Sequence, residues 1–323
     1  MRIAFHNLNL TYRGTTTAIR DYARYNQNIL GNESVIIYNQ NHMMYDDEDR
    51  NKPQIIDDLK RDIELITYDS FEDDVNRICE ENSFDAIYFL KHGTIDYQIT
   101  TNTKNLIHTV FQSNEPHGDR YSFVSSWLAN TMTGNPNNYV PHIVDLPQNP
   151  VYPLRERIGI PKDKIVLGRY GGKFEFNLSF VYSAIEQILA QDDRYVFLFV
   201  NTHKFIDHPN CIFLDPIYSQ QDKTDFIHAC DAMFHGRFQG ETFGLSICEF
   251  LFHNKPVLAW NWGIDMNHVD LLSSTQTLYT PENIIEKLLS LRDPEIYKFD
   301  YRSLVAPFQP KQVMDQFNKI FLT

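Results

Sequence analysis

The chain has few of the features that mark secreted, disulfide-stabilised or membrane-spanning proteins. Its 323 residues include four cysteines without metal-site spacing, which are expected to be buried thiols: Cys79, Cys211, Cys230 and Cys248. No apolar run approaches the roughly 20 residues that cross a bilayer. The amino-terminal segment MRIAFHNLNL also lacks the apolar core of a signal peptide. We therefore expect a soluble, cytoplasmic protein without a transmembrane segment.

Positive charge is scarce as well. Lys and Arg total 29 against 42 Asp and Glu, which gives a net charge of −13. Such a charge repels nucleic-acid phosphates and anionic lipid, and no local run of basic residues offsets it, so we expect no nucleic-acid partner. The composition, with 42% hydrophobic and 22% charged residues, is typical of a globular enzyme. The length suits two α/β domains of about 150 residues each.

Along the chain, short apolar runs rich in β-branched and aromatic residues alternate with longer amphipathic stretches. In the first half, strands are expected at Arg2–Leu8, Ser34–Tyr38, Leu65–Tyr68, Asp85–Leu90, Leu106–Phe111 and Tyr121–Val124, with a helix at Thr15–Leu30. In the second half, strands are expected at Ile165–Tyr170, Tyr195–Asn201, Cys211–Leu214, Ala232–His235 and Pro256–Trp260, and helices at Leu178–Ala190, Gln220–Cys230, Phe243–His253, Pro281–Leu291 and Pro310–Phe321. This alternation predicts two doubly wound, Rossmann-like α/β domains with parallel sheets.

A proline-rich stretch separates the two halves. Five of the 15 prolines lie between Pro141 and Pro161, where neither a helix nor a strand can run far. This stretch is interpreted as the linker between an amino-terminal domain of residues 1–150 and a carboxy-terminal domain of residues 151–305. Two doubly wound domains joined in this way commonly face a cleft, and ligands bind there at the carboxyl ends of the strands.

The most informative segment is HGRFQGETFGLSICEFLFHNKPVLAW, residues 235–260. It passes from a strand ending at His235 through a glycine-bearing loop into a helix near Phe243. Such a loop turns backbone N–H groups and the positive helix end toward a ligand, which suits a phosphate or a sugar oxygen. Glu241 and Glu249 are eight residues apart, so both carboxylates can face one bound molecule. The alternative is that Glu241 caps the helix and Glu249 pairs with a Lys or Arg.

This segment resembles the E-x7-E region of retaining glycosyltransferases of family 4, which have the GT-B fold. The resemblance implies that Glu241 contacts the donor sugar and that Glu249 hydrogen-bonds the ribose. It also implies that the donor lies against Thr242, Phe243, Gly244 and Leu245. The following KPVLAWNWGIDMNHV ends its strand in a glycine-bearing loop, as the family does. The resemblance further implies that residues 151–305 form the nucleotide-sugar donor domain and residues 1–150 the acceptor-side domain. The family's last helix packs on its amino-terminal domain, which implies the same for residues 306–323.

A second segment, IVLGRYGGKFEFN at residues 165–177, forms the first strand and loop after the linker. Its strand ends at Gly168 and Arg169, two further glycines allow close backbone approach, and Lys173 follows. The alternative is a surface turn with two solvated basic residues, although a cleft-facing site is expected at this position. The segment resembles the family's GR…K phosphate-binding element, which implies that Gly168, Arg169 and Lys173 hold the diphosphate. It departs from the commoner pattern, in which the lysine comes one residue later.

Three further candidates are single residues or pairs. In FQSNEPHGDRYSFVSSWLAN, residues 111–130, His117 matches a family histidine that contacts the donor sugar; the alternative is a solvated loop histidine. Gly14 and Thr15, in RGTTTAIRDYA, stand where the family has a glycine-bearing loop, usually a longer one, that faces the diphosphate. Asn201, at the end of a strand, is a donor-binding candidate near the base or simply the residue that ends the strand.

No metal site is expected. The run Asp46–Asp49 contains the D-x-D spacing with which other glycosyltransferases hold a metal ion, but consecutive acids between polar residues are typical of a solvated loop. His203 and His208 have loose ligand spacing without a set of further ligands, so they are interpreted as surface histidines.

Together these residues predict a glycosyltransferase that moves a sugar from a nucleotide-sugar donor to a glycan or other hydroxyl acceptor, with no cofactor. Negative charge grows on the leaving diphosphate, so Arg169, Lys173 and the helix N-terminus would stabilise it. The resemblance implies retention of anomeric configuration, with Glu241 and His117 placed at the sugar. The alternatives are another GT-B enzyme, such as a phosphorylase or epimerase, and a non-catalytic nucleotide-sugar-binding protein. A dehydrogenase is disfavoured because no G-x-G-x-x-G follows the first strand.

Overall fold

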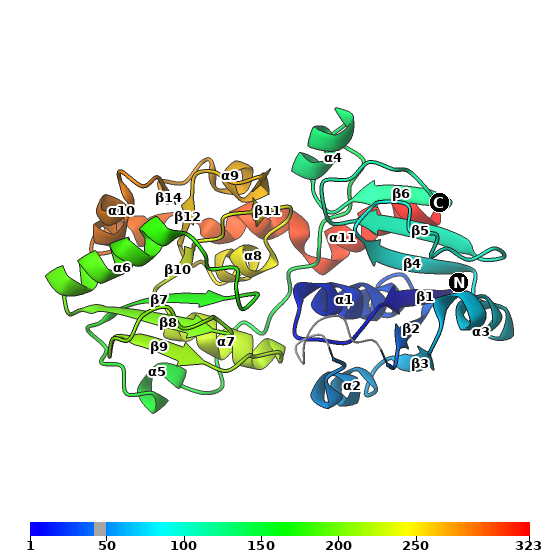
Figure 1. The fold of residues 1–323 in the computed structure, drawn as a ribbon, viewed down its shortest axis with the longest axis horizontal. Coiled ribbons are helices and arrows are strands. Elements are labelled where there is room, and N and C mark those ends of the chain that lie inside the picture. Colours follow the sequence, from blue (N-terminus) through cyan, green and yellow to red (C-terminus); the bar gives the residue numbers. More distant parts are fainter. Residues whose placement is uncertain (42–49) are drawn as a thin grey trace. The chain divides into compact units, whose positions relative to one another are not determined.

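The computed structural model describes residues 1–41 and 50–323, which form two units (Figure 1). Unit 1 comprises Met1–Ile143 together with Phe308–Thr323, and unit 2 comprises Val144–Pro307. The division falls inside the proline-rich stretch, between residues 143 and 144 rather than after residue 150. The acidic run Asp46–Asp49 lies outside the described residues. Within the described part of the chain, no helix has both the length and the apolar character needed to cross a membrane.

Unit 1 is built on six parallel strands in the order β3-β2-β1-β4-β5-β6. The strands are β1 (Arg2–Asn7), β2 (Glu33–Asn39), β3 (Glu64–Tyr68), β4 (Ala86–Lys91), β5 (Lys104–Thr109) and β6 (Arg120–Phe123). Nearly every residue of the central strands β1 and β4 is buried, as expected of a parallel sheet that helices cover on both faces. All six strands predicted for this half are present.

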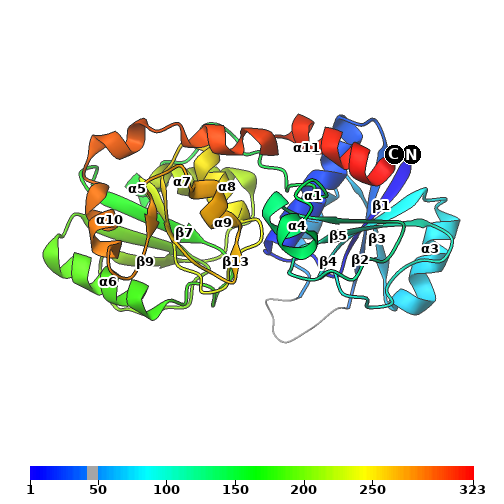
Figure 2. The same ribbon diagram turned by 90° about the horizontal axis from the view of Figure 1, so that it is seen from above.

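The helices of unit 1 come from both ends of the chain. They are α1 (Gly14–Asn28), α2 (Pro53–Leu59), α3 (Asn76–Glu81), α4 (Ser126–Thr133) and α11 (Pro310–Phe317), with π-helical turns at Phe71–Val75 and Asn318–Leu322. α11 packs beside α1 (Figure 2). The ring of Phe317 stacks on Tyr22 of α1, with centroids 5.5 Å apart, and on Phe5 of β1 at 6.4 Å. Residues 308–323 therefore contribute to the hydrophobic core of unit 1.

Unit 2 repeats this topology. Its six parallel strands lie in the order β14-β12-β10-β7-β8-β9. They are β7 (Ile165–Tyr170), β8 (Tyr195–Val200), β9 (Cys211–Leu214), β10 (Ala232–His235), β12 (Val257–Trp260) and β14 (Leu278–Tyr279). The five strands predicted for this half are present, whereas β14 is not among them, because two residues give no periodic signal. A separate ladder joins β11 (Gly240–Glu241) to β13 (Asp265–Met266).

One helix of unit 2 precedes its first strand, and the others alternate with or follow the strands in sequence. They are α5 (Leu154–Arg157), α6 (Ser179–Gln191), α7 (Gln220–Ala229), α8 (Leu245–Phe252), α9 (Asn267–Leu272) and α10 (Ile284–Ser290), followed by 3₁₀ turns at Pro294–Lys298 and Tyr301–Phe308. α6 and α10 pack together over an aromatic core that includes Phe197, Phe199 and Phe234 of the sheet. α8 begins later than predicted, because its N-cap Gly244 has a left-handed φ of 87°.

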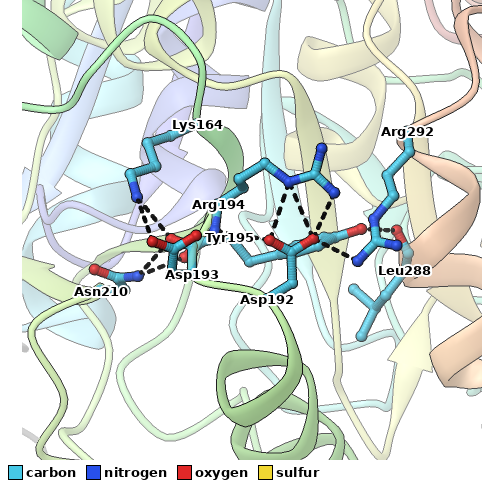
Figure 3. Close-up of polar contacts among 8 residues, drawn as sticks. All are labelled: Lys164, Asp192, Asp193, Arg194, Tyr195, Asn210, Leu288 and Arg292. Atoms are coloured by element: carbon cyan, nitrogen blue, oxygen red, sulfur yellow. Dashed lines mark hydrogen bonds and ion pairs between the residues drawn. The ribbon is translucent and has the colours of Figure 1, made fainter.

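A network of charges lies at the amino edge of the unit 2 sheet, where β8 begins (Figure 3). Asp192, at the end of α6, accepts hydrogen bonds from Arg194 at 2.8–3.2 Å and from Arg292 beyond α10. The hydrogen bonds and charge of Arg194, aided by Arg292, hold the pKa of Asp192 well below its usual range. This network connects α6, β8 and α10, so its role is structural.

Candidate functional site

The carboxyl edge of the unit 2 sheet gathers the charged residues that the sequence singles out. The chain runs from β7 outward to β9 and from β10 outward to β14, so the strand order reverses between β7 and β10. Open α/β sheets bind ligands at such a switch point, outside the carboxyl ends of the strands. A ligand site is therefore expected in the loops after β7 and β10.

Arg169 lies near the end of β7 and is only 5% exposed. Its guanidinium donates to Oγ1 of Thr202 at 2.7 Å and to the carbonyl oxygens of Gly172 at 2.8 Å and Asn201 at 3.3 Å. Burial lowers the pKa of Arg169 to about 10, so the side chain stays charged at neutral pH. Arg169 therefore fastens the loop after β7 to the end of β8 and places a buried cation beside that loop.

The other residues predicted around this loop have different surroundings. Lys173 is exposed, with Nζ 5.7 Å from the ring centroid of Phe174. Asn201 has a left-handed φ of 47°, and its side-chain amide donates to the carbonyl of Gly171 at 3.0 Å, so it helps to hold the loop. Gly168 lies inside β7, where an added Cβ would come within 2.3 Å of the Cys230 sulfur. Packing at this position therefore requires glycine, and the contact of Gly168 with a diphosphate stays a prediction.

Glu241 is the centre of an ion cluster in the loop after β10. Its Oε1 lies 3.0 Å from Nε2 of His235, and its Oε2 accepts a hydrogen bond from Arg237 at 3.0 Å. Arg237 also donates to Glu175 of the loop after β7, again at 3.0 Å. Arg237 thereby links the two loops on either side of the switch point.

The electrostatics of this cluster keep Glu241 ionised. Burial raises the pKa of Glu241, but the hydrogen bond with His235 and the charge of Arg237 outweigh burial and lower it to about 2. The ring of His268 lies 5.2 Å from that of His235, and burial lowers the pKa of His268 to about 4, so it is neutral at pH 7. A carboxylate that remains charged is a strong acceptor for the hydroxyl groups of a sugar.

The N-terminus of α8 follows Glu241 directly. Phe243 and Gly244 are buried and Thr242 and Leu245 are half-buried. The N-cap residue of α8 is Gly244, which has no side chain with which to cap the helix. The ladder between β11 and β13 holds Glu241 in front of this helix end. A helix N-terminus carries partial positive charge and N–H donors, which suits a phosphate.

Glu249 lies within α8, and only 3% of its surface is exposed. Its Oε1 accepts from Nζ of Lys223 on α7 at 2.8 Å, and its Oε2 accepts from the hydroxyl of Tyr170 at 2.5 Å. Burial and the charge of Glu249 raise the pKa of Tyr170, so this hydroxyl remains a donor. The lysine pairing matches the alternative stated for Glu249. Each carboxylate oxygen has a second lone pair, so acceptor capacity remains for a ligand hydroxyl.

The unit 1 candidates lie after the carboxyl ends of its own strands. Gly14 and Thr15 are exposed in the first turn of α1, which follows β1. His117, in the loop between β5 and β6, is half-buried, with Nδ1 2.7 Å from the carbonyl oxygen of Glu115 and its ring 5.7 Å from that of Tyr121. Their contacts with a donor stay predictions.

Solved structures of known proteins share this architecture along its whole length. A glycosyltransferase from Rickettsia africae ESF-5 matches with a TM-score of 0.70 and 14% identity, over 99% of this chain and 98% of that one. HepE of Anabaena, in complex with UDP-glucose, matches over the same shares with a TM-score of 0.72 and 14% identity. The chain has the GT-B fold, as predicted.

The same fold includes a second kind of enzyme. A putative UDP-N-acetylglucosamine 2-epimerase from Listeria monocytogenes matches with a TM-score of 0.63 and 12% identity, over 97% of this chain and 93% of that one. No family model and no curated protein matches the sequence. At these identities the likeness establishes the fold, and the assignment of GT-B chemistry depends on the site.

Sequence reasoning missed several partners at this site. Arg237 has a local signal, because it stands four residues before Glu241 in the same loop. Lys223 has none, because it is separated from Glu249 by 26 residues and reaches it only through the packing of α7 and α8. Among residues 1–41 and 50–323, no group of three His, Cys, Asp or Glu side chains is arranged to hold a metal ion.

Proposed function

We propose that the protein is a glycosyltransferase that moves a sugar from a nucleotide-sugar donor to a hydroxyl acceptor, with the donor held at the carboxyl edge of unit 2. The observation that carries the proposal is the Glu241–Arg237–His235 cluster directly before the N-terminus of α8. This arrangement pairs a fixed carboxylate, suited to sugar hydroxyls, with a positive helix end, suited to phosphate. The fold shared with HepE and its bound UDP-glucose supports the same donor class.

The diphosphate would lie between the α8 N-terminus and the loop after β7. Lys173 would supply a direct cation, whereas buried Arg169 would position the loop and add charge from the protein side. Hydrogen bonds to charged groups contribute about 1.5–3 kcal/mol each. Glu249 would accept a ribose hydroxyl, with Tyr170 and Lys223 fixing the orientation of its carboxylate. The backbone of residues 242–245 and the end of β8 at Asn201 would complete the donor site.

The chemistry requires stabilisation of two developing charges. Positive charge grows on the anomeric carbon and negative charge on the leaving diphosphate, which fixed cations and the helix end would stabilise without a metal ion. Glu241 would hold the sugar hydroxyls and orient the anomeric carbon, and the leaving phosphate would receive the acceptor's proton. Retention of configuration follows from the E-x7-E resemblance. The acceptor would be a glycan or other hydroxyl compound, and the family resemblance assigns sugar and diphosphate contacts to His117, Gly14 and Thr15.

An epimerase acting on the same class of donor is the second candidate, favoured by the likeness to the Listeria protein. Epimerisation at a ring carbon needs a base that removes a proton from carbon, and an efficient base has a pKa near the working pH. The pKa of Glu241 is about 2 and that of His268 is about 4, so both are weak bases at neutral pH. Neither residue is therefore suited to remove a proton from carbon.

The deciding experiment incubates the protein with UDP-, GDP- and ADP-linked hexoses in EDTA, with a mixture of mono- and disaccharide acceptors. Release of nucleoside diphosphate together with a new glycoside, whose anomeric configuration by NMR matches the donor's, is the expected result. An epimerised nucleotide-sugar formed without acceptor identifies the second candidate. Thermal stabilisation by a nucleotide without turnover identifies a binding protein. If no nucleotide-sugar stabilises the protein, the proposed donor site is rejected.

A further inference from the structure

Four aromatic side chains form a partly exposed group on unit 2, which we call the aromatic cluster: Phe180, Phe238, Trp260 and Trp262. The ring centroids of Trp260 and Trp262 lie 5.0 Å apart at 55°, and that of Phe238 lies 6.0 Å from Trp262 and 6.1 Å from Trp260. Phe238 is 49% exposed and Trp262 is 46% exposed. Two of the chain's three tryptophans are therefore in this group. Large aromatic groups gathered at a surface mark sites that bind something.

The aromatic cluster is continuous with the candidate site. Phe238 directly follows Arg237, and its N–H donates to Oδ1 of Asn177 at 2.8 Å. Trp260 is the last residue of β12, and its carbonyl oxygen lies 3.0 Å from Nε2 of His268. The cluster therefore belongs to the loops after β10 and β12, on the same sheet edge as Glu241.

We propose that the aromatic cluster stacks a pyranose ring of a carbohydrate acceptor, which makes it one subsite, on unit 2, for the acceptor of the transfer reaction proposed above. One face of a pyranose presents C–H groups that pack on an aromatic ring, while its rim presents hydroxyls that need polar partners. Such partners border the cluster. Asn261, between Trp260 and Trp262, is exposed, and its side chain makes no hydrogen bond with the described residues. Gln239, which follows Phe238, has a side-chain amide that donates to Asp265 at 2.9 Å.

The geometry favours a sugar over the two other common occupants of an apolar surface. The ring plane of Trp262 is inclined by 55° to that of Trp260 and by 57° to that of Phe238, and the planes of Phe238 and Trp260 are 32° apart, so the cluster offers more than one ring orientation for stacking. A stable protein interface covers about 800 Å² on each partner, far more than four side chains provide. The net charge of −13 opposes binding to anionic lipid.

The test uses tryptophan fluorescence. Trp127, in α4 of unit 1, is the third tryptophan, so in a Trp127→Phe protein the emission comes from the aromatic cluster alone. With a nucleoside diphosphate present, titration with maltose, cellobiose or N,N′-diacetylchitobiose should change this emission saturably. Trp262→Ala and Phe238→Ala in this background should weaken the carbohydrate about tenfold, one factor of ten in Kd. The matched control Tyr152→Ala removes another exposed aromatic ring of unit 2, 53% exposed, and should change nothing.

The outcomes separate this inference from the proposed function. Nucleotide-dependent thermal stabilisation without any carbohydrate response overturns the acceptor subsite and leaves the donor site standing. A carbohydrate response that Trp262→Ala weakens, in a protein that also binds nucleotide, supports the subsite. The same response in a protein that binds no nucleotide overturns both the acceptor role and the transferase proposal and leaves a carbohydrate-binding surface. A dimer that Trp262→Ala dissociates, with no carbohydrate response, identifies a protein interface and overturns the inference.

Discussion

The two units share one strand order but place different chemistry at their carboxyl edges. In unit 1, His6 of β1 lies 2.7 Å from the hydroxyl of Tyr68, and Lys91 at the end of β4 pairs with Asp96, which is 39% exposed. In unit 2, the equivalent strands β7 and β10 end beside Glu249 and Glu241, and each glutamate has a buried or half-buried cation as its partner. A shared topology therefore does not determine the chemistry, which depends on the few residues that follow the strands.

Buried neutral histidines distinguish the units further. In unit 1, burial lowers the pKa of His6 and His108 to about 3 and that of His142 to about 4. In unit 2, burial lowers the pKa of His253 and His268 to about 4 and also lowers that of His228. Unit 1 is therefore expected to be the more sensitive to acid.

The largest effect is expected on acidification, which should lower the stability of unit 1 more than that of unit 2. The unfolded chain binds protons at the ordinary histidine pKa of 6.5, whereas the folded histidines of unit 1 stay neutral to about pH 4, so stability falls with pH across that window. Each histidine contributes about 1.4 kcal/mol per pH unit, which amounts to several kcal/mol by pH 5. Calorimetry with tryptophan emission, from Trp127 in unit 1 and from the aromatic cluster in unit 2, should show unit 1 unfolding first.

The acid prediction has a built-in control. His203 is exposed, so His203→Gln should leave the pH dependence of the melting temperature unchanged. Equal melting temperatures at pH 7 and pH 5, or earlier unfolding of unit 2, would contradict the contrast between the units.

The next-largest effect is expected from replacing one lysine in each unit, which should destabilise unit 2 more than unit 1. Lys223→Met leaves the Glu249 carboxylate buried without its cation, and such stranding costs about 3–5 kcal/mol. Lys91→Met leaves Asp96, which water can reach, so the matched cost should be about 1 kcal/mol or less. Urea denaturation measures both. Similar costs for the two variants would mean that the Lys223–Glu249 pair is no more important to folding than its unit 1 counterpart.

Arg237→Met should lower turnover about 100-fold, because it removes the charge that fixes Glu241 and joins the two loops. The control Arg292→Met removes an arginine from the opposite edge of the same sheet and should leave turnover unchanged. Steady-state release of nucleoside diphosphate measures both. Equal turnover in the two folded variants would place Arg237 outside the reaction.

The two glutamates should then differ from each other. Glu249→Gln should weaken the bare nucleoside diphosphate about tenfold, since the ribose is part of that ligand. Glu241→Gln should leave this affinity nearly intact while reducing the extra affinity for the nucleotide-sugar and the rate of transfer. Calorimetric titration with both ligands separates the cases. Equal losses of bare-nucleotide affinity would reject the separate sugar and ribose roles.

The smallest effect is expected at the amino edge. Asp192→Asn should cost about 1 kcal/mol, because its arginine partners are 47% and 38% exposed and water screens the pairs. The lowered pKa of Asp192 means that its stabilisation is present at neutral pH and disappears as the pH falls below 3.8. Denaturation at pH 7 and pH 3 should show this shrinking difference, with turnover unaffected. A change in turnover would extend the functional region to this edge.

Local patterns in the sequence were sufficient for all strands of the two six-stranded sheets except the two-residue β14, since short apolar runs are local properties. The ligand contacts assigned to the E-x7-E segment stay predictions. Local patterns failed where tertiary contacts decide. The start of α8 depends on the left-handed Gly244, and the surroundings of Gly168 depend on packing against Cys230. The buried state of Glu249 is set by Lys223 on another helix, which no spacing along the chain indicates.

The division of the chain into units has a consequence for biosynthesis. Unit 1 combines Met1–Ile143 with Phe308–Thr323, and the rings of Phe317 and Phe321 cover Tyr88 at centroid distances of 5.4 and 5.7 Å. Unit 2 is continuous, so it can complete its fold on the ribosome while unit 1 still lacks these rings. The part of the chain that is synthesised first therefore finishes folding last. Until residues 308–323 emerge from the ribosome, the surface around Tyr22 and Tyr88 stays exposed on the nascent chain, where a chaperone that holds unfolded chains can bind it.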